Sequence, residues 1–147
     1  MDVRAVRFFN VYGPRMRQHV IQDLIGKMLV NPAGIEFLGD RQQVRKYLHA
    51  DDAARALAVV ATSGQPGGIY NAGTGRGIRV RDLVVMVARI LGFKDMAVTD
   101  TNQSWAGDVR AAVADVSGIR ALGFTPSIGL EEGLAETVNS LRARFNA

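Results

Sequence analysis

The sequence predicts an α/β fold, in which short strands alternate with amphipathic helices. Apolar residues recur at helical spacing over 20–30 and again over 81–91. Val3–Phe9 is instead a short run rich in β-branched and aromatic residues, and it stops at the turn signal Tyr12-Gly13-Pro14. Its apolar residues fall on both faces, which is typical of a buried strand in a parallel sheet.

The other elements are predicted in the same way along the chain. Asn31-Pro32 ends the first helix, because the residue before a proline disfavours helical geometry. A strand (35–38), a turn (39–40) and a second strand (44–49) follow. Asp51-Asp52 could form an acid/base pair or a metal site, but their position favours the N-cap and first turn of a helix that runs through Ala61 and closes at Ser63-Gly64.

The second half of the chain continues the alternation. Residues 69–72 form a short predicted strand bounded by Gly68 and by the glycine-rich turn 73–75. The helix over 81–91 stops at Gly92. A strand near 96–99, a small helix near 116–122 and a terminal helix from Leu130 to about Arg144 complete the prediction.

Composition indicates one globular domain over residues 1–147. The chain has no cysteine, no leader at its N-terminus and no apolar run of roughly 18 residues. We therefore expect a cytoplasmic protein with no membrane partner. The net charge of +4 raises nucleic acid as a partner, but the arginines are scattered, and their small clusters suit a diphosphate better than a duplex. The two histidines, His19 and His49, lack the spacing of metal ligands, and no metal site is predicted.

Several motifs resemble those of extended short-chain dehydrogenase/reductases, the NAD-dependent sugar-nucleotide epimerases and dehydratases. They are residues 7–15 (RFFNVYGPR), 39–52 (GDRQQVRKYLHADD), 104–109 (SWAGDV), and the ending LGFTP (122–126) with LEEGL (130–134). The resemblance covers essentially the whole chain and corresponds to the second, substrate-binding half of the family, with UDP-glucose 4-epimerases as the nearest type. It implies some strands of a Rossmann-type sheet together with the small mixed α/β substrate-binding domain.

The resemblance implies a site for a nucleotide sugar. Arg45 would reach the diphosphate, Asn10 the phosphate or sugar, and Asp108 the ribose. A forked guanidinium suits phosphate oxygens, and an amide both donates and accepts. For a single arginine or asparagine, a solvated hairpin or a turn would be the simpler interpretation, and here the flanking motifs favour binding. Phe8 and Phe9 match the stretch that lines the nicotinamide pocket of bound NAD.

Other residues are weaker candidates for substrate binding. Arg15 could face the phosphate entrance or solvent, and Trp105 could stack on the ligand or fill the core. Arg110 is the candidate substitute for a family arginine that the chain lacks before Gly107. The chain departs from the family motif over 39–52 at two further positions. It has Arg41 where the family usually has a turn glycine, and Lys46 where aspartate or serine is common.

The sequence contains no Gly-x-G-x-x-Gly loop and no tyrosine with a lysine four residues later. The family uses these features to hold NAD and transfer protons, so no catalytic residue is predicted. We expect an N-terminal NAD-binding domain to be absent. The chain could then be a fragment, a truncated gene product or half of a split enzyme. The alternative function is a non-catalytic binding or oligomerisation module.

The strand over 3–9 would lie inside the large sheet of the family. Without that sheet its apolar side chains and backbone donors are exposed, and such edges pair with other strands. We therefore expect association through this strand, either with a missing N-terminal half or with a second copy of the chain. Light scattering at high concentration tests the second case, and a monomeric mass would contradict it.

Overall fold

The computed structural model describes residues 1–37, 43–94, 96–100 and 115–145. Within these ranges the strands form four pairs, three of them parallel and one antiparallel. The parallel pairs are β1 (Ala5–Phe8) with β6 (Ile69–Ala72), β2 (Val11–Tyr12) with β5 (Leu48–His49), and β3 (Gly34–Phe37) with β8 (Ala97–Asp100). The antiparallel pair joins β4 (Val44–Arg45) to β7 (Ile78–Arg79). The predicted α/β class is confirmed.

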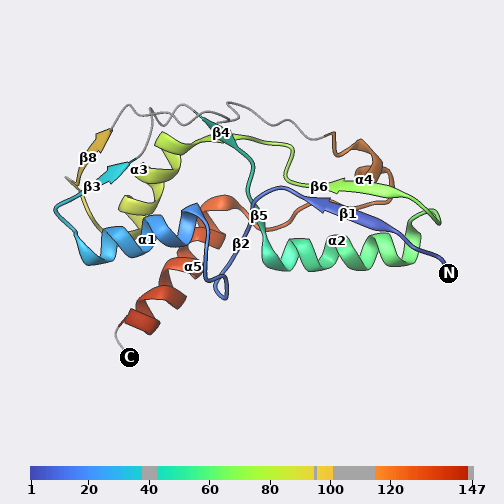
Figure 1. Ribbon diagram of the computed structural model, residues 1–147, viewed down its shortest axis with the longest axis horizontal. Coiled ribbons are helices and arrows are strands. Elements are labelled where there is room, and N and C mark those ends of the chain that lie inside the picture. Colours follow the sequence, from blue (N-terminus) through green and yellow to red (C-terminus); the bar gives the residue numbers. More distant parts are fainter. Residues whose placement is uncertain (38–42, 95, 101–114, 146–147) are drawn as a thin grey trace.

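The helices gather on two sides of the central β2–β5 pair (Figure 1). On one side α2 (Ala50–Ser63) packs against β1 and β6, with α4 (Ser117–Ala121) beside β6. On the other side α1 (Val20–Val30), α3 (Val80–Leu91) and α5 (Leu130–Phe145) pack against one another near β3 and β8. The two termini lie at opposite ends of the molecule.

Each side has its own hydrophobic core. The larger core lies among α1, α3 and α5, and its fully buried side chains include Ile25, Met28, Leu83 and Val87. The smaller core lies between α2, β5, β6 and α4, around Leu48, Ala56, Ile119 and Phe124. Burying such side chains stabilises the fold by about 1.5–3 kcal/mol each. The two cores meet where β5 passes between them.

Most of the predicted elements are confirmed, because their signals are local. The first helix and the strand 69–72 have the predicted bounds, and α3, α4, α5 and β8 lie within two residues of theirs. Gly92 has a φ of 87° and ends α3 in the left-handed region, as expected of a glycine stop. None of the helices in the described ranges is long and apolar enough to cross a membrane.

The predicted strand over 44–49 is wrong as a single element. β4 pairs with β7, which was not predicted, whereas β5 pairs with β2. The chain changes its pairing partner between the two, so the stretch predicted as one strand contains two short strands. β3 likewise pairs with β8 rather than with the strand that follows it. β1 alternates between exposed and half-buried residues and, among the described strands, pairs only with β6, so its association through the other edge stays a prediction.

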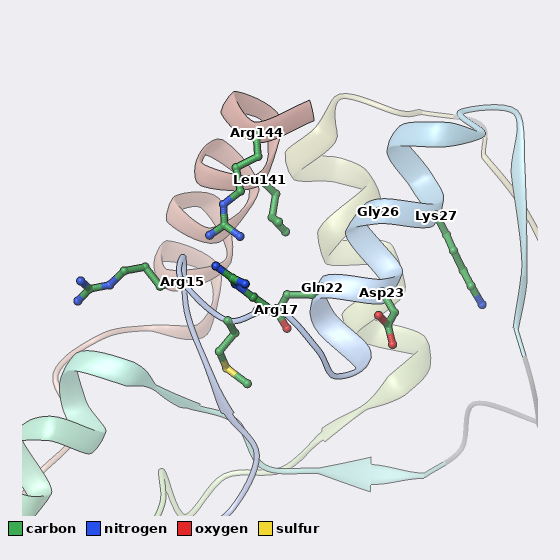
Figure 2. Close-up of a pocket in the computed structure, with 9 residues that line it drawn as sticks. Arg15, Arg17, Gln22, Asp23, Gly26, Lys27, Leu141 and Arg144 are labelled. Atoms are coloured by element: carbon green, nitrogen blue, oxygen red, sulfur yellow. The ribbon is translucent and has the colours of Figure 1, made fainter. Parts of the chain in front are cut away.

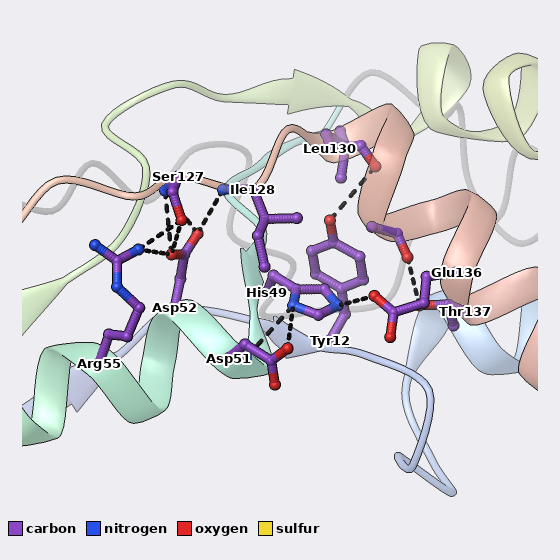
Figure 3. A network of polar contacts seen from close by, with 11 residues as sticks. Tyr12, His49, Asp51, Asp52, Arg55, Ser127, Ile128, Leu130, Glu136 and Thr137 are labelled. Carbon is purple, nitrogen blue, oxygen red and sulfur yellow. Dashed lines mark hydrogen bonds and ion pairs between the residues drawn. The ribbon is translucent and has the colours of Figure 1, made fainter.

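The start of α2 also differs from the prediction. His49 occupies the N-cap, where its Nδ1 accepts a hydrogen bond of 3.4 Å from the backbone N–H of Asp51. Asp51 and Asp52 lie in the first turn, where negative charge favours the helix dipole. The side chain of Asp52 is fully buried and turns away from the helix to bind the segment before α5 (Figure 3).

The buried Asp52 carboxylate holds this segment through several hydrogen bonds. It accepts from the backbone N–H and hydroxyl of Ser127 and from the N–H of Ile128, at 3.0–3.1 Å. Arg55 lies 2.6 Å from the same carboxylate and balances its charge. Burial alone would raise the pKa of Asp52, but these donors outweigh it and leave the pKa below its usual range.

Gly133 explains why α5 approaches β2 and β5 so closely. A Cβ at this position would overlap the Tyr12 hydroxyl and would stand 2.9 Å from Cδ2 of His49. A real side chain cannot occupy that space without moving the aromatic rings. The glycine of the LEEGL motif therefore has a packing role, in accord with the structural role that the resemblance implies for this ending.

The Asp52 contacts lead to a stability prediction. We expect Asp52→Asn to lower the free energy of unfolding by about 2–3 kcal/mol, because the amide replaces one buried acceptor oxygen with a donor and removes the charge that pairs with Arg55. Asp51→Asn is the matched control, since it removes the same charge from the same helical turn at an exposed position and should cost at most about 0.5 kcal/mol. Urea denaturation measures both. Equal losses in the two variants would contradict the assigned role of Asp52.

Candidate functional site

Asn10 lies at the junction between β1 and β2, where the chain turns into the centre of the molecule. Its φ of 41° is in the left-handed region, which asparagine tolerates better than most residues. The side-chain Nδ2 donates to the carbonyl of Lys46 at 3.1 Å, and the backbone carbonyl of Asn10 accepts from the N–H of Leu48 at 3.2 Å. These bonds fix the amide, and Oδ1 has no hydrogen-bond partner within the described ranges.

Arg45 lies on β4, immediately before the carbonyl that Asn10 binds. It is half-buried, and its Nη1 donates to the carbonyl of Val44 at 3.3 Å. β4 is held by its antiparallel pairing with β7, in which Arg45 faces Ile78. The structure therefore brings the Asn10 side chain to the carbonyl of Lys46, the residue after Arg45, although the two segments are far apart in sequence. We call Asn10, Arg45 and Lys46 the Asn10–Arg45 site.

Lys46 is the member of this site that the sequence did not single out as functional. Only 7% of its surface is exposed, yet its side-chain ammonium makes no hydrogen bond or ion pair with another described residue. A lysine is rarely so buried without a partner. The one available signal was its departure from the aspartate or serine usual at this position in the motif, which places a second cation next to Arg45 in the sequence.

The other predicted binding residues lie elsewhere. Phe8 and Phe9 are half-buried and pack against the smaller core, near the end of β1. Arg15 is exposed and lines a cavity on the α1–α5 side of the molecule rather than the Asn10–Arg45 site. Trp105, Asp108 and Arg110 lie outside the described residues, and so do the turn at 39–40 and Arg41. Their roles stay predictions.

Tyr12, Tyr47 and His49 form a cluster of buried aromatic rings, in which the Tyr12 and His49 rings are visible in Figure 3. The Tyr12 ring stands edge-on to Tyr47 and to His49, with centroids 6.2 and 5.4 Å apart. His49 is 1% exposed and therefore belongs to the core, and its Nε2 lies 3.4 Å from a carboxylate oxygen of Glu136. Tyr12 donates to the carbonyl of Leu130 at 3.4 Å.

Neither buried phenol is suited to proton transfer at neutral pH. Burial raises the pKa of Tyr47 to about 12, and the positive charge of Arg45 offsets only part of this rise. Burial also raises the pKa of Tyr12, and the negative charges of Asp52, Glu132 and Glu136 raise it further. A catalytic tyrosine needs the opposite shift, toward the working pH. Tyr12 and Tyr47 are therefore neutral packing groups.

The described residues contain no group of three or more histidine, aspartate or glutamate side chains placed to hold a metal ion. What the Asn10–Arg45 site offers is a guanidinium, an ammonium and an amide carbonyl on fixed backbone. Such a set can bind and orient an anionic, hydroxylated ligand. It supplies no nucleophile, so the chemistry that it supports by itself is binding.

The chain is similar in sequence to known proteins over almost its whole length. Residues 1–73 match the NAD dependent epimerase/dehydratase family. A dTDP-glucose 4,6-dehydratase from Streptomyces griseus is 33% identical over 94% of the chain. These matches support membership of the NAD-dependent epimerase/dehydratase family. A UDP-glucuronate 4-epimerase from Thermodesulfobacterium geofontis is 32% identical over 95% of the chain. The chain spans 42% and 43% of the lengths of these two relatives.

Solved structures show the same likeness in the fold. A UDP-N-acetylglucosamine 4-epimerase from Methanobrevibacter ruminantium, in complex with UDP-N-acetylmuramic acid, superposes with a TM-score of 0.87 at 27% identity, over 98% of this chain and 47% of that one. MoeE5 in complex with UDP-glucose and NAD gives a TM-score of 0.81 at 36% identity, over 98% and 48%. The likeness extends over the whole chain but over only about half of each neighbour.

The raised pKa of Tyr47 gives a testable pH dependence. Its phenol is neutral when buried, so its contribution to stability is complete below the unfolded pKa of 10.0 and is lost as the pH rises through about 12. The Tyr47 hydroxyl is also buried without a hydrogen-bond partner in the described structure. We expect Tyr47→Phe to keep or raise the free energy of unfolding at pH 7, by up to about 1 kcal/mol.

Above pH 10 the Tyr47→Phe variant should lose stability less steeply than the wild type, by as much as about 1.4 kcal/mol per pH unit. Chemical denaturation at a series of pH values from 7 to 11 measures this difference. Parallel curves for the two proteins would show that Tyr47 does not titrate differently on unfolding.

Proposed function

We propose that the Asn10–Arg45 site binds a nucleotide sugar, as the substrate-binding portion of an NAD-dependent epimerase or dehydratase. The observation that carries the proposal is the hydrogen bond from Asn10 Nδ2 to the carbonyl of Lys46. It joins two segments that the sequence motifs had assigned independently to the same ligand. The nucleotide sugars bound by MoeE5 and by the Methanobrevibacter epimerase support this substrate class.

Each residue of the site has a separate task in this proposal. Arg45 supplies a permanent charge and forked donors to the diphosphate. Lys46 adds positive charge beside it, since its side chain makes no ion pair within the described ranges. Asn10 presents Oδ1 as an acceptor for a sugar hydroxyl, because its Nδ2 is already held by the backbone. Together these side chains would bind and orient the substrate and neutralise part of its charge.

NAD would supply the hydride chemistry of the whole enzyme. The fit of this chain to NAD is partial. Phe8 and Phe9 provide an apolar wall at the end of β1, but the sequence has no glycine-rich pyrophosphate loop, and Tyr12 and Tyr47 have raised rather than lowered pKa values. We propose no proton-transfer or hydride step for these residues. Turnover would need residues beyond those of the printed sequence.

The alternative function, a non-catalytic binding or oligomerisation module, uses the same fold without turnover. The two proposals differ in whether the chain retains a specific site for the nucleotide sugar. Titration with a ligand of that class therefore distinguishes them, and it requires no partner protein.

We expect the purified chain to bind UDP-glucose saturably in a calorimetric titration, and Arg45→Ala to weaken binding about tenfold or more, because a charge-assisted contact to phosphate is lost. Arg79→Ala is the matched control, since Arg79 is an exposed arginine on the strand paired with β4. It should change affinity less than about twofold. Asn10→Gly keeps the left-handed backbone and should weaken binding through the lost amide.

Equal losses in the Arg45 and Arg79 variants would indicate nonspecific attraction to a basic protein. A folded wild-type chain with no affinity for UDP-glucose would contradict the proposal that this chain forms the binding site by itself. Far-ultraviolet circular dichroism of every variant provides the folding control.

A further inference from the structure

A cavity, which we call the α1–α5 cavity, lies between the loop that follows β2, helix α1 and the end of α5 (Figure 2). Its volume is about 790 Å³, which is within the range of small-molecule sites. Neither Asn10 nor Arg45 lines it. The lining residues are Arg15, Met16, Arg17, Gln22, Asp23, Gly26, Lys27, Leu141 and Arg144.

The cavity has an excess of positive charge. Four of its lining residues are cations and only one, Asp23, is an anion. In the described structure Arg15, Arg17 and Lys27 form no ion pair. Figure 2 shows the guanidinium groups of Arg17 and Arg144 directed to the same region of the cavity, while the guanidinium of Arg15 and the ammonium of Lys27 point outward. Cations gathered in a hollow raise the local potential and attract an anion.

The walls that present these charges are tied together. Arg144 and Ser140 of α5 both donate to the carbonyl of Pro14, and Gln22 of α1 donates from Nε2 to the carbonyl of Gly13 at 3.2 Å. The loop that contains Arg17 is therefore fixed to both helices. The cavity is formed by the folded chain and does not depend on the conformation of one long side chain.

Gln22 also provides an acceptor that has no partner. Its side chain is 6% exposed, and its Oε1 is buried without a hydrogen bond in the described structure. The carbonyl of Gly13 fixes the orientation of the amide, because only the Nε2 end can donate to it. A buried carbonyl without a donor is costly, so a ligand that donates a hydrogen bond at this point would be favoured.

We propose that this cavity binds a phosphate monoester or hydrogen phosphate. Arg17 and Arg144 would pair with the anionic oxygens, and Gln22 Oε1 would accept a hydrogen bond from the protonated phosphate oxygen or from a hydroxyl on the same ligand. Sulfate has a similar shape and charge but no proton at neutral pH, so it satisfies the arginines and leaves Gln22 unpaired. The site is separate from the proposed nucleotide-sugar site.

The experiment is a calorimetric titration of the purified chain with inorganic phosphate, sulfate and glucose 6-phosphate at constant low ionic strength. We expect phosphate to bind about fivefold or more tightly than sulfate, because of the hydrogen bond to Gln22. Arg17→Ala should weaken phosphate binding about tenfold. Arg81→Ala removes the same charge from an exposed position on α3 and should have little effect. Tighter binding of glucose 6-phosphate than of phosphate would identify a phosphorylated small molecule as the ligand, and the reverse order would identify free phosphate.

Gln22→Leu provides a second, independent test. It removes the acceptor, so the preference for phosphate over sulfate should disappear while anion binding persists. If loss of the Gly13 contact unfolds this variant, the Arg17 variant still tests the site, since Arg17 has no hydrogen bond or ion pair among the described residues. Equal affinities for phosphate and sulfate in the wild type, or equal losses in the Arg17 and Arg81 variants, would overturn the proposal. Phosphate binding that is lost in the Arg17 variant by a chain that does not bind UDP-glucose would support this cavity while contradicting the nucleotide-sugar proposal, so the two outcomes are distinguishable.

Discussion

The parallel pairing of β2 with β5 holds the two sides of the molecule together. It joins residues 11–12 to residues 48–49, and thereby sets Asn10 against the carbonyl of Lys46 and His49 against Tyr12. Both cores include residues of these strands, because Tyr12 faces the α1–α3–α5 side and Leu48 the α2 side. A shift of one residue in this register would turn each side chain to the opposite face, so the core and the Asn10–Arg45 site depend on the same few backbone bonds.

Helix α5 is fixed to this centre by polar contacts and by one small residue. Asp52 binds the segment that leads into the helix, and Gly133 allows the helix to lie against the Tyr12 and His49 rings. The far end of α5 then reaches the loop at Pro14 and brings Arg144 to the α1–α5 cavity. The position of a cation at one end of the helix therefore depends on the packing of a glycine near the other end.

The two proposed sites use positive charge in different ways. In the Asn10–Arg45 site the cations stand beside an amide that the backbone already holds, which suits a ligand with both phosphate and hydroxyl groups. In the α1–α5 cavity two guanidiniums stand near a buried carbonyl that lacks a donor, which suits a protonated or hydroxylated phosphate. Some of the cations behind the chain's net charge of +4 therefore lie in these two proposed sites. This distribution accords with anionic small-molecule ligands better than with a nucleic-acid duplex.

Much of the secondary structure was predictable because its signals are local. The apolar spacing of 20–30, the Asn31-Pro32 stop and the glycine after Leu91 act within a few residues, and α1, α3 and β6 follow them closely. The motif resemblance likewise indicated Asn10 and Arg45, whose segments meet only in the folded chain.

What the tertiary structure decided depends on partners distant in sequence. The stretch 44–49 became two strands because β7 and β2 compete for adjacent residues, and an apolar pattern does not name its partner. Asp52 was predicted to cap its helix, but its carboxylate binds Ser127 and Ile128, which lie 75 and 76 residues away. The unpaired Oε1 of Gln22 has no signature in the sequence at all. The sequence by itself determined the local elements. Long-range packing alone determined strand pairing, buried charge and the α1–α5 cavity, because these arise from contacts that no short window of residues contains.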